Sequence, residues 1–127
     1  MSAQTLALQA KKPSGWLGKN ILLPMFVKGN AELNQFILEL MAVQANQNVL
    51  EVGFAPGHLL FKLCQQNPSA QFTGLDFSPL MLHQATLYAQ LFIDSIQLSL
   101  FEASSNNMPF NNASFHQVAC ANTLYFW

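Results

Sequence analysis

The strongest pattern in the chain is an alternation of apolar runs and amphipathic stretches between residues 48 and 76. Residues 48–52 form a short apolar run rich in branched side chains, which predicts a strand. Residues 58–66 change to the spacing of a helix with one apolar face, and residues 71–75 predict a second strand. Because a helix joins the two strands, the pattern predicts a parallel pair with a right-handed crossover.

Further patterns extend this alternation in both directions along the chain. Asn30 is positioned to cap one helix, and Ser78-Pro79 is a strong start for another. Pro24 is expected to kink or end an early helix. The predicted elements are helices over residues 17–26, 31–45 and 78–92 and strands over residues 96–100 and 116–121. In the second of these helices the expected buried stripe is Leu33, Phe36, Ile37, Leu40 and Met41.

The order of these elements predicts an α/β fold with a Rossmann-like open parallel sheet and flanking helices. Residues 1–30 are expected to be an N-terminal segment with a lid helix, and residues 31–127 to be the domain itself. In such a sheet the ligand binds at the carboxyl ends of the strands. Polar residues follow all four predicted strands there, at Glu51, Asp76, Glu102 and Asn122.

Composition narrows the classes of function. The 127 residues suffice for one domain, and only 9% of them are charged. The net charge is −1 and the chain contains no arginine, which argues against nucleic acid as a partner. No secretory signal or membrane-spanning run is evident, so we expect a cytoplasmic protein. The two cysteines lie in apolar segments without the spacing of a metal site, so no metal is expected.

The turn after the first strand carries the clearest candidate chemistry. It follows the pattern ExGxAxG over Glu51, Gly53, Ala55 and Gly57, which lets backbone approach a ligand at the start of a helix. Asp76 follows Gly57 by 19 residues, close to the spacing of an acid that holds ribose hydroxyls beside a glycine turn. This combination predicts a nucleotide-like ligand.

The motifs that surround this turn resemble those of class I S-adenosylmethionine-dependent methyltransferases. The matching segments are VLEVGFAPG, GLDFSPLML, MPFNNASF and NTLYFW, and KPSGWLGKNILLPM is similar to the leading segment of one branch of that family. The resemblance implies S-adenosylmethionine as cofactor and an unidentified, small-molecule methyl acceptor. It also implies the strand order 3-2-1-4, in a sheet that is truncated after about four of the family's seven strands.

The resemblance assigns the cofactor-binding residues one by one. It places Glu51, Gly53 and Gly57, with Ala55 between the two glycines, around the methionine moiety of the cofactor. It implies that Asp76 accepts hydrogen bonds from the ribose, that Phe77 and Met81 lie against the adenine, that Ser104 and Ser105 lie beside the adenine amine, and that Asn122 faces the methyl-transfer side. No catalytic acid or base is expected, because the sulfonium is already activated and the acceptor needs mainly to be positioned.

Departures from the family pattern leave other functions open. Ala55 stands where the family has its middle glycine, and Pro56 is expected to hold Ala55 at extended angles. Ser104 stands where an acid usually faces the adenine, with Glu102 as a possible substitute, and His116 stands in place of another acid. The alternatives are an inactive remnant or interaction module and a nicotinamide-dependent oxidoreductase. The open edge of the fourth strand predicts self-association or a partner chain.

Overall fold

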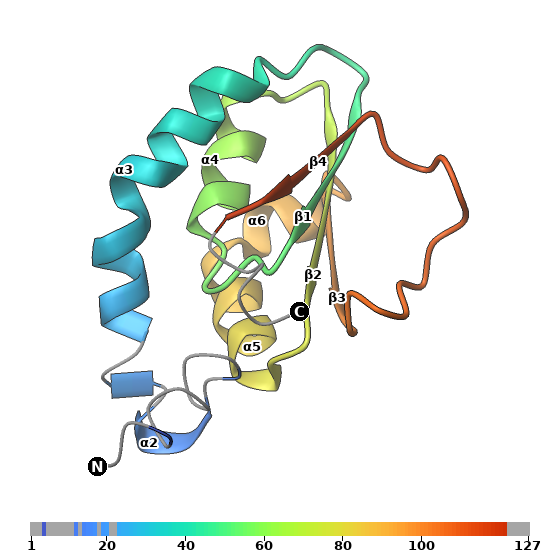
Figure 1. Cartoon of the computed structure of the whole chain (residues 1–127). Helices are drawn as coiled ribbons and strands as arrows, with labels where there is room; N and C mark the ends of the chain where they lie inside the picture. Colours follow the sequence, from blue (N-terminus) through green and yellow to red (C-terminus); the bar gives the residue numbers. More distant parts are fainter. Residues whose placement is uncertain (1–3, 5–11, 13, 18, 21–22, 122–127) are drawn as a thin grey trace.

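Four parallel strands form one open sheet in the centre of the computed structural model, which describes residues 4, 12, 14–17, 19–20 and 23–121 (Figure 1). The strands are β1 (Asn48–Val52), β2 (Gln71–Asp76), β3 (Leu98–Glu102) and β4 (Gln117–Cys120). They lie in the order β3-β2-β1-β4, and every neighbouring pair is parallel. The predicted fold class and strand order are therefore confirmed.

The helices gather on one face of this sheet, and the loop of residues 103–116 projects on the opposite side (Figure 1). The described helices are α2 (Gly15–Leu17), α3 (Leu23–Met41), α4 (His58–Gln66), α5 (Pro79–Tyr88) and α6 (Gln90–Asp94). α5 begins as the sequence predicts, because the Ser78 hydroxyl accepts a hydrogen bond from the Met81 amide at 3.3 Å and Pro79 is the first helical residue. Within the described ranges, no helix is both long enough and apolar enough to cross a membrane.

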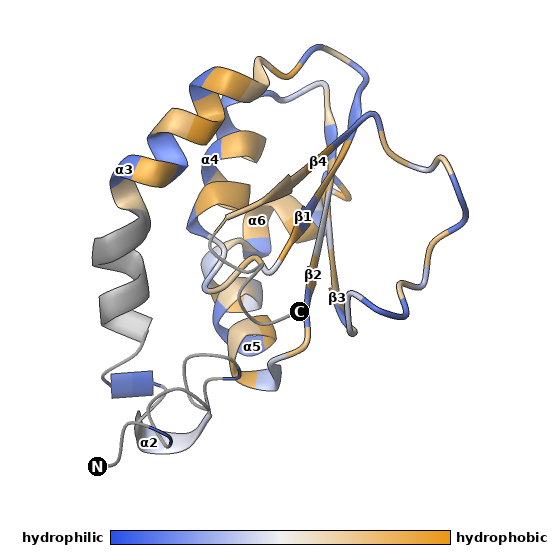
Figure 2. Cartoon of the chain, viewed as in Figure 1, coloured by the Kyte–Doolittle hydropathy of each residue, from blue (hydrophilic) through white to orange (hydrophobic). Residues whose placement is uncertain are grey.

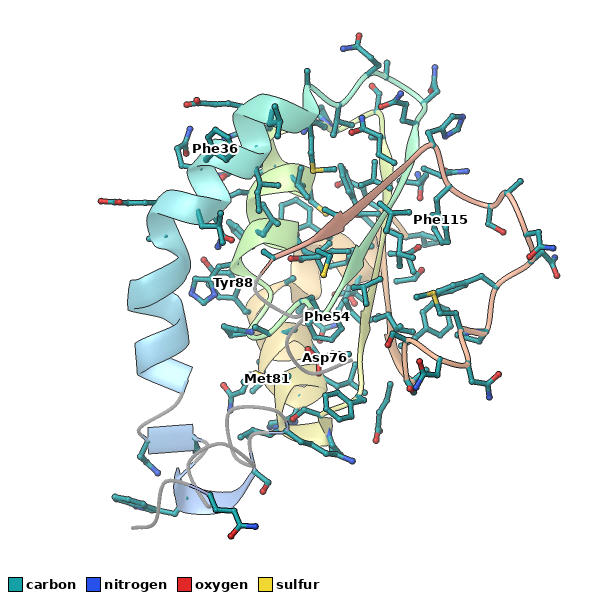
Figure 3. The ribbon with its side chains drawn as sticks, in the orientation of Figure 1. Phe36, Phe54, Asp76, Met81, Tyr88 and Phe115 are labelled. Atoms are coloured by element: carbon teal, nitrogen blue, oxygen red, sulfur yellow. The ribbon has the colours of Figure 1, made fainter. Side chains whose placement is uncertain are left out.

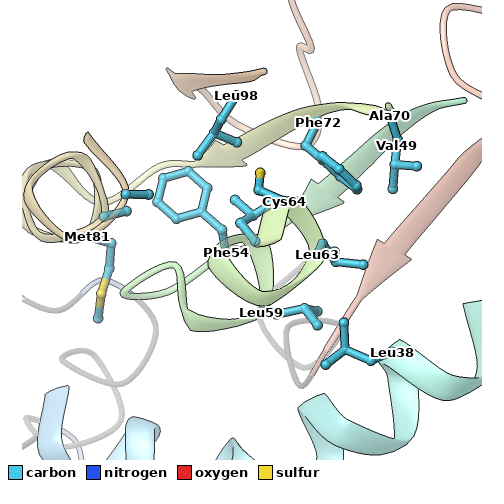
Figure 4. Packing of buried hydrophobic residues seen from close by; sticks show 13 residues of the cluster. Leu38, Val49, Phe54, Leu59, Leu63, Cys64, Ala70, Phe72, Met81 and Leu98 are labelled. Atoms are coloured by element: carbon cyan, nitrogen blue, oxygen red, sulfur yellow. The ribbon is translucent and has the colours of Figure 1, made fainter. Parts of the chain in front are cut away.

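The core lies mainly between the sheet and α4. Leu59, Leu60 and Leu63 of α4 are buried against residues of β1, β2 and β3 (Figure 4). Each such side chain contributes about 1.5–3 kcal/mol when it is fully buried. The opposite face has a smaller cluster of Leu50, Val52 and Leu75, on which Phe110 and Phe115 of the loop pack. Apolar residues accordingly run along β1 and β2, whereas the outer part of the loop is polar (Figure 2).

The first long helix differs from its prediction. α3 begins at Leu23 and continues through Asn30, so Asn30 is not a cap and Pro24 does not break the helix. Proline is tolerated there because the first amides of a helix have no intrahelical partner. The helix also spans the expected boundary between residues 30 and 31, and the division of the chain into a leading segment and a domain stays a prediction.

The predicted buried stripe of this helix is partly wrong. The side chains of Phe36 and Leu40 are 59% and 71% exposed, whereas Leu38 is buried against α4. Leu33, Ile37 and Met41 are half-buried. The reason is that α3 packs on α4 rather than directly on the sheet, and a helix covered by one other helix buries a narrower stripe.

Two elements after β2 also differ from their predictions. The helix predicted over residues 78–92 divides at Ala89 into α5 and α6. The third strand begins at Leu98, because Ile96 has a φ of 64° and forms a turn instead of a strand. This turn brings the Gln97 side chain to the end of α4, where it donates to the carbonyl oxygens of Cys64 and Asn67.

Replacing Ile96 with glycine is expected to stabilise the protein. A left-handed conformation is an outlier for a β-branched residue and costs about 1–2 kcal/mol relative to the right-handed one. Ile96 is exposed, so its side chain loses little packing when it is removed. We expect the free energy of unfolding in urea to rise by about 1 kcal/mol in Ile96→Gly. Leu91→Gly, at an exposed site inside α6, should instead be destabilised.

β4 leaves one edge of the sheet open, since in the described residues it pairs with β1 and with no other strand. Val118 pairs with Leu50 in the register of β4 and β1, lies on the face of the sheet away from the helices, and is 62% exposed. Self-association or a partner chain at this edge stays a prediction.

Candidate functional site

The candidate site lies at the carboxyl ends of β1 and β2, where α4 and α5 begin. We call this edge of the sheet the rim. Residues from the turn of 53–57 and from the beginning of α5 meet there, and Phe54, Asp76 and Met81 lie close to one another in Figure 3. Phe36 and Phe115 lie well away from it in the same view. The first and second strands therefore bring together the residues that the sequence motif separates by about 20 positions.

Three of the five residues in the turn of 53–57 have left-handed backbone angles. Gly53, Ala55 and Gly57 have φ values of 74°, 52° and 91°. The Gly53 amide donates to the Leu75 carbonyl oxygen at 2.6 Å, which ties the turn to β2. The expectation that Pro56 holds Ala55 extended is wrong. The Ala55 amide donates instead to Asp76 Oδ2 at 3.1 Å, and this long-range contact outweighs the local preference.

Replacing Ala55 with glycine is expected to relieve the strain of this turn. Alanine in a left-handed conformation costs about 1–2 kcal/mol, whereas glycine adopts it without a steric penalty. Part of that gain is lost because glycine has more freedom in the unfolded chain. We expect Ala55→Gly to raise the midpoint of urea unfolding, by about 0.5–1 kcal/mol in free energy. Ala70→Gly, a buried alanine outside the turn, should lower it.

Asp76 connects the turn to the beginning of α5. Its Oδ2 accepts the Ala55 amide, and its Oδ1 accepts the Ser78 amide at 2.9 Å. The side chain is only 8% exposed. Burial raises the pKa of Asp76, and the hydrogen bonds from the amides of Ser78, Ala55 and Phe77 act in the opposite direction. A carboxylate has about four acceptor positions, so these contacts do not exhaust it.

Glu51 is the second carboxyl group of the rim and has a different environment. It is 2% exposed, and its Oε1 has no hydrogen-bond partner among the residues that the structure describes. In the sheet Glu51 is flanked by Gly74 of β2 and Ala119 of β4, neither of which has a polar side chain that could donate to its carboxyl group. Burial raises the pKa of Glu51 well above its ordinary value, and the Asp76 charge raises it further.

Gly57 brings α4 and α5 into close contact at the rim. A Cβ atom on Gly57 would lie 2.9 Å from the Ala85 Cβ, closer than the Cβ atoms of folded proteins come to non-bonded neighbours. Met81 lies one turn before Ala85 on α5 and is buried in the core beside Phe54 (Figure 4). Phe77 is half-buried, and the Lys12 ammonium lies 5.4 Å from the centre of its ring, within the range of a cation–π contact. Lys12 therefore lies beside the rim.

The remaining predicted site residues lie on the loop after β3 or beyond the described part of the chain. The loop leaves from the rim, since the Ala103 amide donates to the Asp76 carbonyl oxygen at 3.0 Å. Ser104 and Ser105 follow, and the Ser104 hydroxyl accepts the Asn106 amide at 3.2 Å. Asn122 lies outside the described residues. His116 belongs to the opposite end of the sheet, where its Nδ1 accepts the Asn48 amide at 2.8 Å.

Three residues of the rim were not singled out as site residues from the sequence. Phe54 is buried and packs against Gly74, and Ser78 is buried as both a cap and a donor to Asp76. His58 begins α4, and its ring stacks on Tyr88 at a centroid distance of 4.3 Å. Burial and the nearby Lys62 lower the pKa of His58. Of these three residues, only Ser78 has a signal in the sequence, since Ser78-Pro79 predicts the start of a helix, and that signal does not indicate the contact with Asp76.

The parallel sheet, with a glycine turn tied to the acid at the end of β2, places this chain among the Rossmann-like α/β domains, and comparison with known families assigns its family. Residues 49–127 match the model of a family described as "Methyltransferase domain". The chain belongs to this family, and the resemblance predicted from the sequence motifs is confirmed. A curated relative is an uncharacterized methyltransferase, YdaC, of Bacillus subtilis strain 168. It is 24% identical over 98 residues, which cover 77% of this chain and 52% of the relative.

Solved structures agree on the fold. One match is a chain from the complex of the Trm112 methyltransferase activator with a methyltransferase of Haloferax volcanii. It has a TM-score of 0.70 and 22% identity, and the match covers 82% of this chain and 44% of that one. Another is a methyltransferase of Geobacter sulfurreducens in complex with S-adenosylhomocysteine, with a TM-score of 0.63, 18% identity and coverages of 76% and 38%. The chain thus spans about half the length of the curated relative and less than half the length of these two structures.

Proposed function

We propose that the rim binds S-adenosylmethionine and that this chain provides the cofactor-binding part of a methyltransferase with a small-molecule acceptor. The observation that carries this proposal is the bond from the Ala55 amide to Asp76 Oδ2, which joins the glycine turn to the acid of the second strand. Family membership supports it. The Geobacter sulfurreducens structure supports the choice of cofactor, because that methyltransferase is in complex with the demethylated product.

The residues of the rim suit the different parts of this cofactor. Asp76 has acceptor capacity left beyond its backbone partners and lies at the end of β2, where it would take the ribose hydroxyls. Phe77 is half-buried beside it and offers a ring face to the adenine. Glu51 and the turn of residues 53–57 would line the methionine moiety. Ser104, Ser105 and Asn122 remain assignments by resemblance.

The cofactor, when bound, supplies a methyl group already activated by a positively charged sulfur. Glu51, Asp76 and the turn of residues 53–57 would hold the cofactor, and the chemistry that it would supply is transfer of this methyl group to an acceptor that loses a proton, with the electron pair of the broken carbon–sulfur bond left on sulfur. The rim therefore has to bind and orient the cofactor and to exclude water, rather than to supply an acid or a base. None of its described residues is assigned a catalytic role.

A binding module without transferase activity is the second candidate, and Ala55 favours it. Ala55 adds a methyl group to a left-handed residue in the turn of residues 53–57, at a position where the family pattern has glycine. A nicotinamide-dependent oxidoreductase is disfavoured by the family match and by the spacing of the glycines.

Isothermal titration calorimetry separates these candidates. We expect saturable heats with S-adenosylmethionine and with S-adenosylhomocysteine, and none with NAD. Binding of both sulfur ligands, together with methyl transfer from labelled cofactor to a small-molecule pool, supports the enzyme. Binding without transfer would favour the module, and heat with NAD alone would overturn the proposal.

A further inference from the structure

Two carboxyl groups from neighbouring strands lie on the same face of the sheet at the rim, but only one of them has the partners that a charge needs. The two oxygens of Asp76 accept hydrogen bonds from the backbone amides of Ala55 and Ser78. Glu51 is almost fully buried, and its Oε1 receives none from the described residues. Two interacting carboxyl groups in such different environments have different pKa values, so one of them keeps its proton more readily than the other.

The other elements around Glu51 bring little compensating charge. On one side β4 presents Ala119, and the described residues of that strand include no charged residue. The turn of residues 53–57 is uncharged as well. α4 packs on the same face and carries His58, Lys62 and the buried Cys64 thiol, whose pKa is raised by burial to about 12. The pKa of His58 is lowered, so this imidazole favours its neutral form.

We propose that Glu51 holds a proton when the rim is empty and gives it up when the methionine end of the cofactor binds, so that each binding event releases a proton to solvent. This inference rests on the function proposed above. In the empty site an ionised Glu51 would place a second negative charge beside Asp76, with no donor to its buried Oε1. The methionine moiety brings an ammonium group, and S-adenosylmethionine also brings a sulfonium. Either cation favours the ionised form of a nearby carboxyl group.

The direction of the raised pKa agrees with this assignment. Burial comes first among its causes and the charge of Asp76 second, and both favour protonated Glu51. Asp76 receives opposing contributions from its amide donors, which favour its ionised form. Glu51 is therefore the protonated member of the pair, and it has to lose this proton before it can form an ion pair with a bound cation.

The test is calorimetry of the full chain with S-adenosylhomocysteine at pH 7 in phosphate and in Tris, whose ionisation enthalpies differ widely. Proton release makes the apparent binding enthalpy depend on the buffer, and we expect close to one proton per ligand bound. The apparent Kd should also fall as pH rises from 6 to 7.5, by up to about tenfold per pH unit. Glu51→Gln should abolish the buffer dependence, and Glu39→Gln, on the exposed surface of α3, should retain it.

The outcomes distinguish this inference from the function on which it rests. Binding with the same enthalpy in both buffers would overturn the proton release and leave the cofactor assignment intact. Proton release that persists in Glu51→Gln would also overturn it, since the proton would come from another group. Absence of binding would remove the proposed function and the inference together. The comparison of buffers uses the unaltered chain, so it decides the question even if Glu51→Gln does not fold.

Discussion

Asp76→Ala is expected to abolish binding of S-adenosylhomocysteine and to lower the free energy of unfolding by about 2–4 kcal/mol. The loss of stability follows because the part-buried amide of Ala55 and the buried amide of Ser78 would both lose their acceptor. The loss of binding follows because the turn would no longer be tied to β2 and the ribose would lose its acceptor. Urea unfolding measures the first effect, and calorimetry with the ligand measures the second.

Glu102→Ala is the matched control for the effect of this substitution on stability. Glu102 lies beside Asp76 in the register of β2 and β3, but its side chain is exposed. Its replacement should change stability by less than about 0.5 kcal/mol. Asp76→Asn should fall between the two, because one amide oxygen remains to accept a backbone donor. If Asp76→Ala were as stable as the control and still bound the ligand, Asp76 would have neither role.

The arrangement of strands and helices around the rim could be predicted from the sequence, because local rules determine it. Apolar runs of strand length on either side of a helical pattern gave β1, α4 and β2 at their observed positions. The Ser78-Pro79 pair gave the start of α5. Parallel strands joined by helices then bring Glu51 and Asp76 to one edge of the sheet, so the meeting of these acids follows from topology alone.

The conformation of Ala55 could not be predicted in the same way. The preference set by Pro56 acts between adjacent residues, whereas Asp76 accepts the Ala55 amide from 21 positions further along the chain. The exposure of Phe36 and Leu40 has a similar origin. Helical spacing shows that a helix has an apolar face, but the width of the face that becomes buried depends on what packs against it, here mainly α4.

Three constraints at position 57 favour glycine. The sequence motif suggests that glycine lets backbone approach a ligand, and the structure adds that glycine lets α4 approach α5 at Ala85. Its φ of 91° is a third constraint, which any residue with a side chain meets poorly. The ligand contact, the helix contact and the backbone angle predict different responses to substitution.

Gly57→Ala is expected to lower the free energy of unfolding by about 2–4 kcal/mol, which combines the left-handed backbone with overpacking against α5. Ala85→Gly alone should cost about 1 kcal/mol, because glycine is unfavourable within a helix. In the double variant the added methyl group takes the space of the removed one. From a Cβ atom on residue 57, the nearest obstacle is the Ala85 Cβ at 2.9 Å, and the Ala85 Cα at 3.4 Å is at an ordinary contact distance. Removing the Ala85 Cβ therefore removes the overlap, and the double variant should be more stable than the sum of the two single effects predicts.

The same double-mutant cycle decides how much of the glycine requirement belongs to the ligand. If the helix contact accounts for the overpacking, Ala85→Gly should recover the packing part of the stability, and only the cost of the left-handed backbone should remain. Affinity for S-adenosylhomocysteine should recover in parallel if Gly57 acts by positioning α4. Recovery of stability without recovery of affinity would show that the new methyl group obstructs the ligand directly. Strictly additive stabilities would contradict the close contact between Gly57 and Ala85.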